Sequence, residues 1–382
     1  MRHVSIVGTG YVADLYMQSL ATFSDISVRA AFDRNPERLA AFCRHWKVPP
    51  ADGLAQLLED AGIEEVILNL TNPDSHFEVS SACLAAGHHV YSEKPLAMEM
   101  EAARTLHRIA GEKGLLLASA PCSVLGKAAQ TLWKAVRDGR IGRPLLVYAE
   151  LDDGFISQAP YRQWVSASGA PWPFADEFRV GCTVEHAGYY LTWLIAMFGP
   201  VRSVTAASAV LDETKLGNLP TAPDFSVAVL FFDHGVTARL TCSIIARHDH
   251  AMRIVGEAGT LEVGEAWDNS APVRLRRRRR VRRRLIEMPF TRRIRFGEAT
   301  GRKVARFGSA SMNFALGPAE MLDAISEGRP CRLTADLALH LNEVTLAIQQ
   351  AGSTTGTVRM TTDCAPLEPM SGAMGQTEIR RG

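Results

Sequence analysis

The sequence predicts an α/β protein in which a doubly wound parallel sheet is followed by an α+β domain on an open, mainly antiparallel sheet. Short apolar runs alternate with helix-like segments over residues 1–121, which is typical of parallel strands joined by helical crossovers. Beyond residue 142, longer strand-like runs follow one another without a helix between each pair. The 382 residues suffice for two domains, which we expect at 1–121 and 122–360, before a mobile tail at 361–382.

The first stretch of the chain carries the most informative motif. A β-branched run over residues 3–7 meets Gly8-Thr9-Gly10-Tyr11-Val12-Ala13, whose spacing is G-x-G-x-x-A and whose last residues begin a helix-like segment. Gly8 permits a tight turn, Gly10 lets the backbone approach a pyrophosphate, and the helix N-terminus offers N–H groups to phosphate. The alternative is an ordinary strand, turn and helix without a ligand, because glycines mark turns in many proteins.

A second apolar run, residues 26–32, ends at Asp33. This lies in the window about 20 residues beyond the glycines where an acidic residue binds the adenosine ribose of a dinucleotide. The carboxylate favours NAD, because it repels a 2′-phosphate. Arg34 leaves NADP open, since a guanidinium binds such a phosphate or stacks on adenine.

The following runs complete the parallel sheet. Helices are predicted from residue 36, over 54–58, over 74–86 with Gly87 as the C-cap, and over 101–110. Strands are predicted at 66–70, 90–91 and 115–118. Ligands of such sheets lie at the carboxyl ends of the strands. The residues that the chain places there are Thr71, Asn72, Pro73, Glu93, Lys94 and Pro121.

The second part is richer in strands, which are predicted at 145–150, 201–210, 225–232, 236–244 and 252–255. A helix over 185–198 interrupts them, and helices over 319–326 and 336–350 close the fold. We expect the exposed face of this sheet to pair with another copy, as a homodimer or homotetramer.

Composition excludes several classes of protein. The hydrophobic share is 47% and the charged share 22%, which is ordinary for a globular chain, and a net charge of +1 argues against nucleic acid as a partner. No apolar stretch reaches the roughly 18 residues of a membrane span, and we expect no signal peptide, because Met1-Arg2-His3 runs directly into a strand-like segment. The seven scattered cysteines form no C-x-x-C pair, so they predict reduced cytoplasmic thiols and no metal site.

Residues 274–284 are an unusual run of arginines, broken only by Leu275 and Val281. So many like charges repel one another and favour a solvated edge or loop. The alternative is a polyanion-binding patch, which little aromatic interleaving supports.

Glu93-Lys94-Pro95 is the second informative motif. A lysine at a strand end beside a nicotinamide can hold a substrate hydroxyl and lower its pKa, and the proline stiffens the turn that aims it. Alone, the tripeptide is equally typical of a surface loop. The dinucleotide motif before it favours the functional interpretation.

These motifs together resemble the glucose–fructose oxidoreductase, inositol dehydrogenase and MocA family. The matching segments are residues 8–13, 33–37, 71–76 with His76, 86–97, 181–199 and 337–340 with His340. The resemblance implies a Rossmann domain, an open antiparallel sheet, and NAD(P)-dependent oxidation or reduction of a sugar, cyclitol or related polyol. It assigns the family lysine to Lys94 and the nicotinamide-site glutamate to Glu93, and it includes the cofactor residues Gly8, Thr9, Gly10, Tyr11, Val12, Asp33, Arg34, Thr71, Asn72, Pro73, His76 and Pro121.

The resemblance also implies a catalytic cluster at the start of the central helix. Many family members carry D-x-x-x-H there, whereas aligning this chain through Gly199 gives Glu185 and Tyr189. Glu185 and Tyr189 share a helix face, and His186 lies one position round from Glu185. Histidine titrates nearest neutrality, so His186 is one candidate base; Tyr189 beside Lys94 is the other.

Aromatic and acidic residues near this cluster predict the substrate subsite. Tyr161, Arg162, Trp164 and Trp172 suit the apolar face of a sugar ring and an anionic group, although tryptophans in loops also form small cores. Asp152 is expected to bind substrate hydroxyls or to cap a turn, together with Asp153.

The leading hypothesis is hydride transfer between nicotinamide and a carbinol carbon of a sugar, nucleotide sugar or cyclitol. One rival is a cofactor-binding regulator without turnover, suggested by the tyrosine at position 189. The other rival is a polyanion-binding scaffold that uses the arginine run.

Overall fold

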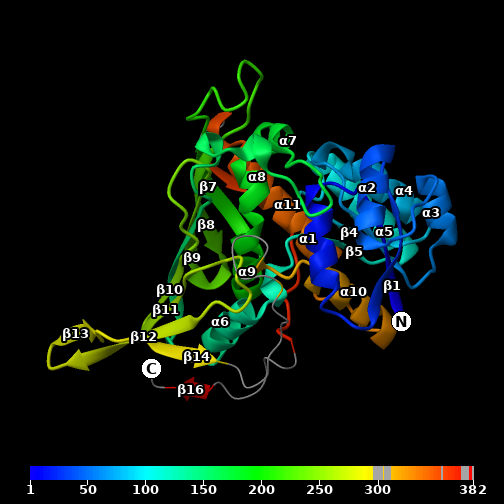
Figure 1. Ribbon diagram of the computed structural model, residues 1–382. Helices are drawn as coiled ribbons and strands as arrows, with labels where there is room; N and C mark the ends of the chain where they lie inside the picture. The colour runs from blue at the N-terminus through cyan, green and yellow to red at the C-terminus, as the bar shows by residue number, and fades with distance from the viewer. Residues whose placement is uncertain (296–303, 305–310, 354–355, 371–377, 381–382) are drawn as a thin grey trace.

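The computed structural model describes residues 1–295, 304, 311–353, 356–370 and 378–380. The described chain builds two sheets that lie side by side, each covered by helices (Figure 1). The first is a five-stranded parallel sheet in the order β2-β1-β3-β4-β5. Its strands are β1 Arg2–Val7, β2 Ile26–Phe32, β3 Val66–Asn69, β4 His89–Ser92 and β5 Leu117–Ser119. Its helices are α1 Tyr11–Leu20, α2 Pro36–Trp46, α3 Leu54–Asp60, α4 His76–Ala85 and α5 Met100–Lys113.

Local chemistry starts and stops these helices. Asn35 accepts the Arg38 backbone N–H at 3.0 Å as the N-cap of α2, and Pro36 occupies the first helical position. Gly114 adopts the left-handed conformation that ends α5. The strand order changes direction between β1 and β3, and this switch point is where doubly wound sheets bind their ligands.

The second sheet has eleven strands and is antiparallel except for the parallel pair β6–β9. Its order is β15-β7-β8-β9-β6-β10-β11-β12-β14-β16, with β13 paired to β12. Its strands are β6 Pro144–Asp152, β7 Val201–Ala209, β8 Phe225–Phe232, β9 Thr237–Ser243, β10 Met252–Gly256, β11 Gly259–Val263, β12 Val273–Val281, β13 Arg284–Glu287, β14 Arg292–Arg295, β15 Thr357–Arg359 and β16 Glu378–Arg380. The predicted fold class is thereby confirmed.

Six helices accompany this sheet: α6 Lys127–Arg137, α7 Phe174–Val180, α8 Cys182–His186, α9 Gly188–Phe198, α10 Leu316–Glu327 and α11 Ala335–Gln349. The helix predicted over 185–198 corresponds to the end of α8 and the whole of α9. The two are separated only at Ala187, which keeps helical dihedral angles. Gly188 begins α9, and an added Cβ there would lie 2.9 Å from Pro121, so the helix passes close to the end of the parallel sheet.

The last two helices return to the first sheet. α10 packs beside β3, and α11 packs against α5, β5 and β7. One continuous apolar core therefore runs from Val4 in β1 to Cys364 near the end of the chain. The domain limits at residues 121 and 360 stay a prediction. Within the predicted second domain, α11 contacts strands of both sheets, β5 in the first and β7 in the second.

The tail expected to be mobile from residue 361 is instead packed over residues 361–370. Glu343 accepts both the backbone N–H and the hydroxyl of Thr362, and Met370 donates its N–H to Gln130 at 2.9 Å. Cys364 is buried in the apolar core, and Leu367 and Met370 pack against it. Sequence periodicity could not reveal this, because these contacts are irregularly spaced and no helix or strand forms over residues 361–370. Residues 371–377 lie outside the described residues.

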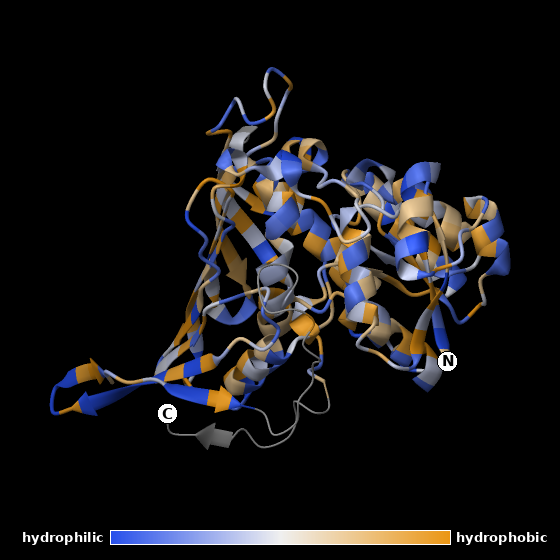
Figure 2. Ribbon diagram, in the orientation of Figure 1, coloured by the Kyte–Doolittle hydropathy of each residue, from blue (hydrophilic) through white to orange (hydrophobic). Residues whose placement is uncertain are grey.

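The arginine run forms β12 and its hairpin partner β13. The outer end of β12 and the whole of β13 project from the body of the molecule as a largely hydrophilic ribbon (Figures 1 and 2). Residues 279–287 are all exposed, which agrees with the predicted solvated edge.

Among the described residues, no helix combines the length and apolar character needed to cross a bilayer.

Candidate active site

Two adjoining cavities lie along the carboxyl edge of the parallel sheet. The larger encloses about 550 Å³ between the two sheets, and the smaller encloses about 370 Å³ over β1, β2 and β3. Both are lined by the same five residues where they meet: Gly10, Arg38, Leu70, Thr71 and Asn72. The two cavities therefore form one elongated site at the switch point of the sheet.

The glycine turn after β1 is shaped to admit a ligand. Gly8 has φ +93°, and an added Cβ would lie 2.7 Å from the carbonyl carbon of Leu70, so only glycine fits there. Gly10 is the N-cap of α1, and an added Cβ would meet no atom within 4 Å. The N-terminus of α1 at Gly10 thus borders open space, which suits a pyrophosphate.

Asp33 is held at the end of β2 by its own neighbours. Its carboxylate accepts the Thr9 backbone N–H at 2.8 Å, the Asn35 N–H at 2.8 Å, and two N–H groups of Arg38 at 3.0 Å each. Burial raises the pKa of Asp33, but these donors outweigh it and leave the pKa below its ordinary value. A fixed anion therefore borders the smaller cavity.

Sequence reasoning missed Arg38, which lines both cavities. Its only sequence signal is its position one helical turn beyond the Asn35 cap. Arg34 also lines the smaller cavity and donates to the Ser75 hydroxyl at 2.6 Å. Two guanidinium groups therefore border the expected adenosine end of the site.

Lys94 projects into the larger cavity from the end of β4. Glu93 braces the turn, because its carboxylate accepts the Tyr16 hydroxyl at 2.7 Å and the Lys94 backbone N–H at 3.1 Å. The Lys94 ammonium forms an ion pair with Glu185 of α8. Burial lowers the pKa of Lys94, but the charge of Glu185 and of further acidic groups keeps it well above its ordinary value. Lys94 is therefore a permanent cation at neutral pH.

Glu177 of α7 is a second residue that sequence reasoning missed. It lines the larger cavity, and its carboxyl group is hydrogen-bonded to that of Glu185. Burial and the charge of Glu185 raise the pKa of Glu177 well above its ordinary value, whereas Lys94 holds the pKa of Glu185 low. The two carboxyl groups therefore differ, because Lys94 favours the charged form of Glu185 while burial and Glu185 disfavour the charged form of Glu177.

Tyr189 and His186 both line the larger cavity, as predicted for the helix start. Burial raises the pKa of Tyr189, and the nearby Lys94 charge lowers it only in part. Tyr189 is therefore a neutral acid at physiological pH.

His186 is held at both ring nitrogens. Nδ1 lies 3.0 Å from the Cys182 carbonyl oxygen, and Nε2 lies 3.1 Å from Oδ2 of Asp153. Burial raises the pKa of Asp153, but hydrogen bonds from His186 and His248 bring it to about 2. Because both ring nitrogens face oxygen acceptors, the ring has no lone pair directed at the cavity.

The residues predicted for the substrate are only partly brought together. Trp164 and Trp172 line the larger cavity and pack against each other with ring centroids 5.1 Å apart. Tyr161 lies behind them and donates its hydroxyl to the Lys215 carbonyl at 3.0 Å, and Arg162 lies over the Phe174 ring.

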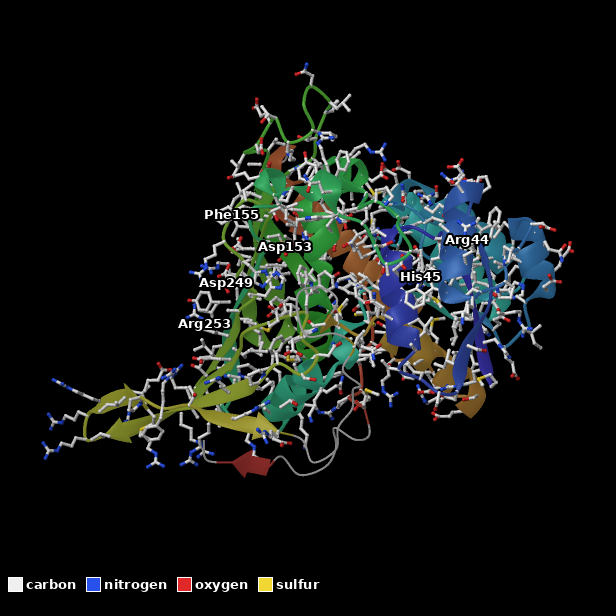
Figure 3. All side chains as sticks on the ribbon, viewed as in Figure 1. Arg44, His45, Asp153, Phe155, Asp249 and Arg253 are labelled. Carbon is white, nitrogen blue, oxygen red and sulfur yellow. The ribbon has the colours of Figure 1, made fainter. Side chains whose placement is uncertain are left out.

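Asp152 is not among the residues that line the larger cavity, whereas Asp153 is. Asp152 pairs its backbone with Asp249 of the neighbouring segment, so the strand ends one residue before the side chain that turns inward. In Figure 3, Asp153 lies at the larger sheet, far from Arg44 and His45 on α2.

Three further predicted residues have supporting positions. His76 lies between the carbonyl oxygens of Pro95 at 2.6 Å and Thr71 at 2.9 Å, so it braces the two loops that carry Lys94 and Asn72. Pro121 lines a small void beneath Tyr189. His340 is a core residue, since its Nε2 accepts the Val201 N–H at 2.9 Å.

Comparison with known proteins agrees with this arrangement. Residues 2–120 match the oxidoreductase family with the NAD-binding Rossmann fold, and residues 129–262 match the C-terminal domain of the same family. The chain belongs to the glucose–fructose oxidoreductase, inositol dehydrogenase and MocA family of oxidoreductases. The parallel sheet and its helices are thus the NAD-binding Rossmann domain of this family.

Among curated proteins, the mouse trans-1,2-dihydrobenzene-1,2-diol dehydrogenase (Mus musculus) is 26% identical over 69% of this chain and 74% of its own length. Among solved structures, a levoglucosan dehydrogenase in complex with NADH and levoglucosan has a TM-score of 0.75, at 16% identity over 94% of this chain and all of the other. The Bordetella pertussis dehydrogenase WlbA, in complex with NADH and UDP-GlcNAcA, has a TM-score of 0.71, at 19% identity over 95% of this chain and 97% of the other. At these identities the structural matches establish the fold.

Proposed function

We propose that the protein is an NAD(P)-dependent dehydrogenase or reductase that acts on a carbinol carbon of a sugar, nucleotide sugar or cyclitol. The observation that carries this proposal is the group of Lys94, Glu185 and Tyr189 in a cavity continuous with the glycine turn. NAD(P), when bound, supplies or accepts the hydride at its nicotinamide ring. The substrates named for similar proteins, a diol, levoglucosan and a sugar nucleotide, all carry hydroxyl groups.

The chain's own groups have separate tasks in this proposal. Lys94 donates a hydrogen bond to the substrate oxygen and stabilises negative charge that develops on it. Glu185 holds the ammonium in position. In the direction of reduction, Tyr189 gives its proton to the carbonyl oxygen and becomes a phenolate. In the direction of oxidation, that phenolate takes the proton of the substrate hydroxyl.

His186 is less suited to be the base, because its two nitrogens are already engaged with Cys182 and Asp153. We propose instead that it positions Asp153 at the cavity wall, where the carboxylate can accept a substrate hydroxyl. Trp164 and Trp172 offer aromatic faces to the apolar side of a ring.

Location and assembly extend the proposal. All seven cysteines are buried and unbonded, which suits a reducing cytoplasm. We propose that the face of the eleven-stranded sheet pairs with a second copy, as predicted from the sequence.

The experiment is a screen of polyols, sugars and sugar nucleotides with NAD⁺ and with NADP⁺, followed by absorbance of the reduced nicotinamide. We expect turnover with at least one hydroxyl-bearing class. Tight binding of either cofactor, combined with no turnover of any hydroxyl compound in either direction, would instead identify a regulator and overturn the proposal.

A further inference from the structure

A second cluster of ligand-type side chains lies beside the larger cavity, at one edge of the antiparallel sheet. Asp153 directly follows β6, His248 and His250 precede β10, and Glu265 follows β11. β10 pairs with both β6 and β11 in antiparallel register. This pairing brings the last residues of β6 and β11 and the first residues of β10 to the same end of the strands, so residues far apart in the sequence meet there.

One carboxylate orients both imidazoles. Oε1 of Glu265 lies 2.8 Å from Nδ1 of His250, and Oε2 lies 3.0 Å from Nε2 of His248. Each of these nitrogens donates its hydrogen to Glu265. The other nitrogen of His250 is then the one that can offer a lone pair, which is how carboxylates behind metal-binding histidines select the tautomer. On His248 the other nitrogen faces Asp153, and a bound cation would take the place of the hydrogen between them.

The ring nitrogens that do not face Glu265 have different surroundings in His248 and in His250. Nδ1 of His248 lies 3.7 Å from Oδ1 of Asp153. Nε2 of His250 is buried, in a residue only 1% exposed, and has no hydrogen-bond partner among the described residues. Trp267 packs edge-on to the His250 ring, with centroids 4.4 Å apart, and holds the ring in place. A buried imidazole nitrogen without a partner is uncommon and calls for a ligand.

We propose that Asp153, His248 and His250 bind one divalent cation of the zinc class. One ligand atom from each residue lies within 4.8 Å of the others, so small side-chain rotations bring all three to one ion. Two imidazoles and one carboxylate are a typical ligand set for such ions, and three protein ligands leave a position for water or another oxygen ligand.

The site borders the cavity without overlapping the Lys94 group. Asp153 uses its other oxygen to hold His186, which lines the cavity. A cation here would therefore hold Asp153 and His186, which both line the larger cavity. The inference does not depend on the proposed reaction, because it concerns binding of the metal alone.

The test is equilibrium dialysis of the full-length chain against Zn²⁺ after treatment with a chelator, with metal content measured per chain and no cofactor present. We expect one Zn²⁺ per wild-type chain and none at the same free metal concentration for His248→Ala, whose partly exposed side chain can be removed without disturbing the core. Asp153→Asn is expected to lose the ion as well, and Glu265→Gln to weaken binding by roughly 10- to 100-fold.

The matched control is His107→Ala, which removes an exposed histidine that is paired with Asp336 outside the cluster. It should bind Zn²⁺ as the wild type does. Circular dichroism checks that each variant is folded. Absence of zinc from the folded wild-type chain would overturn the proposal, as would equal zinc content in wild type and His248→Ala.

Discussion

Replacing Lys94 by methionine tests the chemistry of the site most fully. The change keeps the length of the side chain and removes the ammonium that is paired with Glu185. We expect kcat/KM to fall by about 10²- to 10⁴-fold, equivalent to about 3–5 kcal/mol of lost transition-state stabilisation. Cofactor binding should persist, because the glycine turn and Asp33 are untouched.

Lys94→Met should also lower the free energy of unfolding, by an amount that the exposure of the ion pair limits. Breaking a fully buried ion pair destabilises a protein by about 3–5 kcal/mol, because the remaining charge is left without a partner. The Lys94 side chain is 19% exposed toward the cavity, so water screens the pair and the loss should be smaller. The double variant Lys94→Met/Glu185→Gln removes the orphaned charge and should recover most of the stability without recovering activity.

The assays are steady-state kinetics with the substrate found by the screen, calorimetric titration of the cofactor, and urea unfolding. Lys113→Met is the matched control, because this lysine only donates to the Ala85 carbonyl at the surface. Wild-type kcat/KM in Lys94→Met, or recovery of activity in the double variant, would refute the role given to the ammonium.

Three further predictions concern the first domain and the core. Gly8→Ala should lower the free energy of unfolding by about 1–3 kcal/mol, because φ is +93° and the new Cβ would collide with Leu70. Gly10→Ala should fold normally, because its Cβ meets no atom, but should bind the cofactor less tightly. Thermal unfolding and calorimetry distinguish the two, and equal stability of both variants would contradict the geometry. The stability that Asp33 contributes is fully present above its ordinary pKa of 3.8 and is lost as pH falls through its lower pKa in the folded protein. The Arg38 guanidinium is partly exposed, so Arg38→Ala should lower the free energy of unfolding by about 1 kcal/mol. The variant should also unfold at a higher pH during acid titration. An unchanged acid transition would count against the pair. Burial lowers the pKa of His340 from 6.5, so the stability that its neutral ring contributes is present above pH 6.5 and is lost as pH falls through the pKa in the folded protein. In His340→Gln, the free energy of unfolding should therefore decline less steeply below pH 6.5. A decline as steep as in wild type would assign the pH dependence to other groups.

The parts of the site that sequence reasoning found are those with local signals. Gly8, Gly10 and Lys94 stand at strand ends, and a strand end is visible in the sequence because an apolar run stops there. Glu185 and Tyr189 were located by their helical spacing together with the family resemblance. Their roles stay predictions.

The parts that sequence reasoning missed depend on contacts between distant segments. Glu177 meets Glu185 only because Gly181, with φ +100°, turns the chain between α7 and α8. His248 and His250 meet Asp153 through strand pairing nearly a hundred residues apart in the sequence. Asp152 and Asp153 are both expected at the cavity or in a turn, but only Asp153 lines the cavity. Successive side chains of a strand point to opposite faces, so a one-residue difference in where the strand ends decides which of the two turns inward.

The most direct test of the central claim is a crystal structure of the protein with NAD⁺ or NADP⁺ bound. The account predicts the adenosine in the smaller cavity beside Asp33, the pyrophosphate at the Gly8–Gly10 turn, and the nicotinamide in the larger cavity next to Lys94. A nicotinamide ring bound away from Lys94, or a cofactor bound at any other surface, would contradict it.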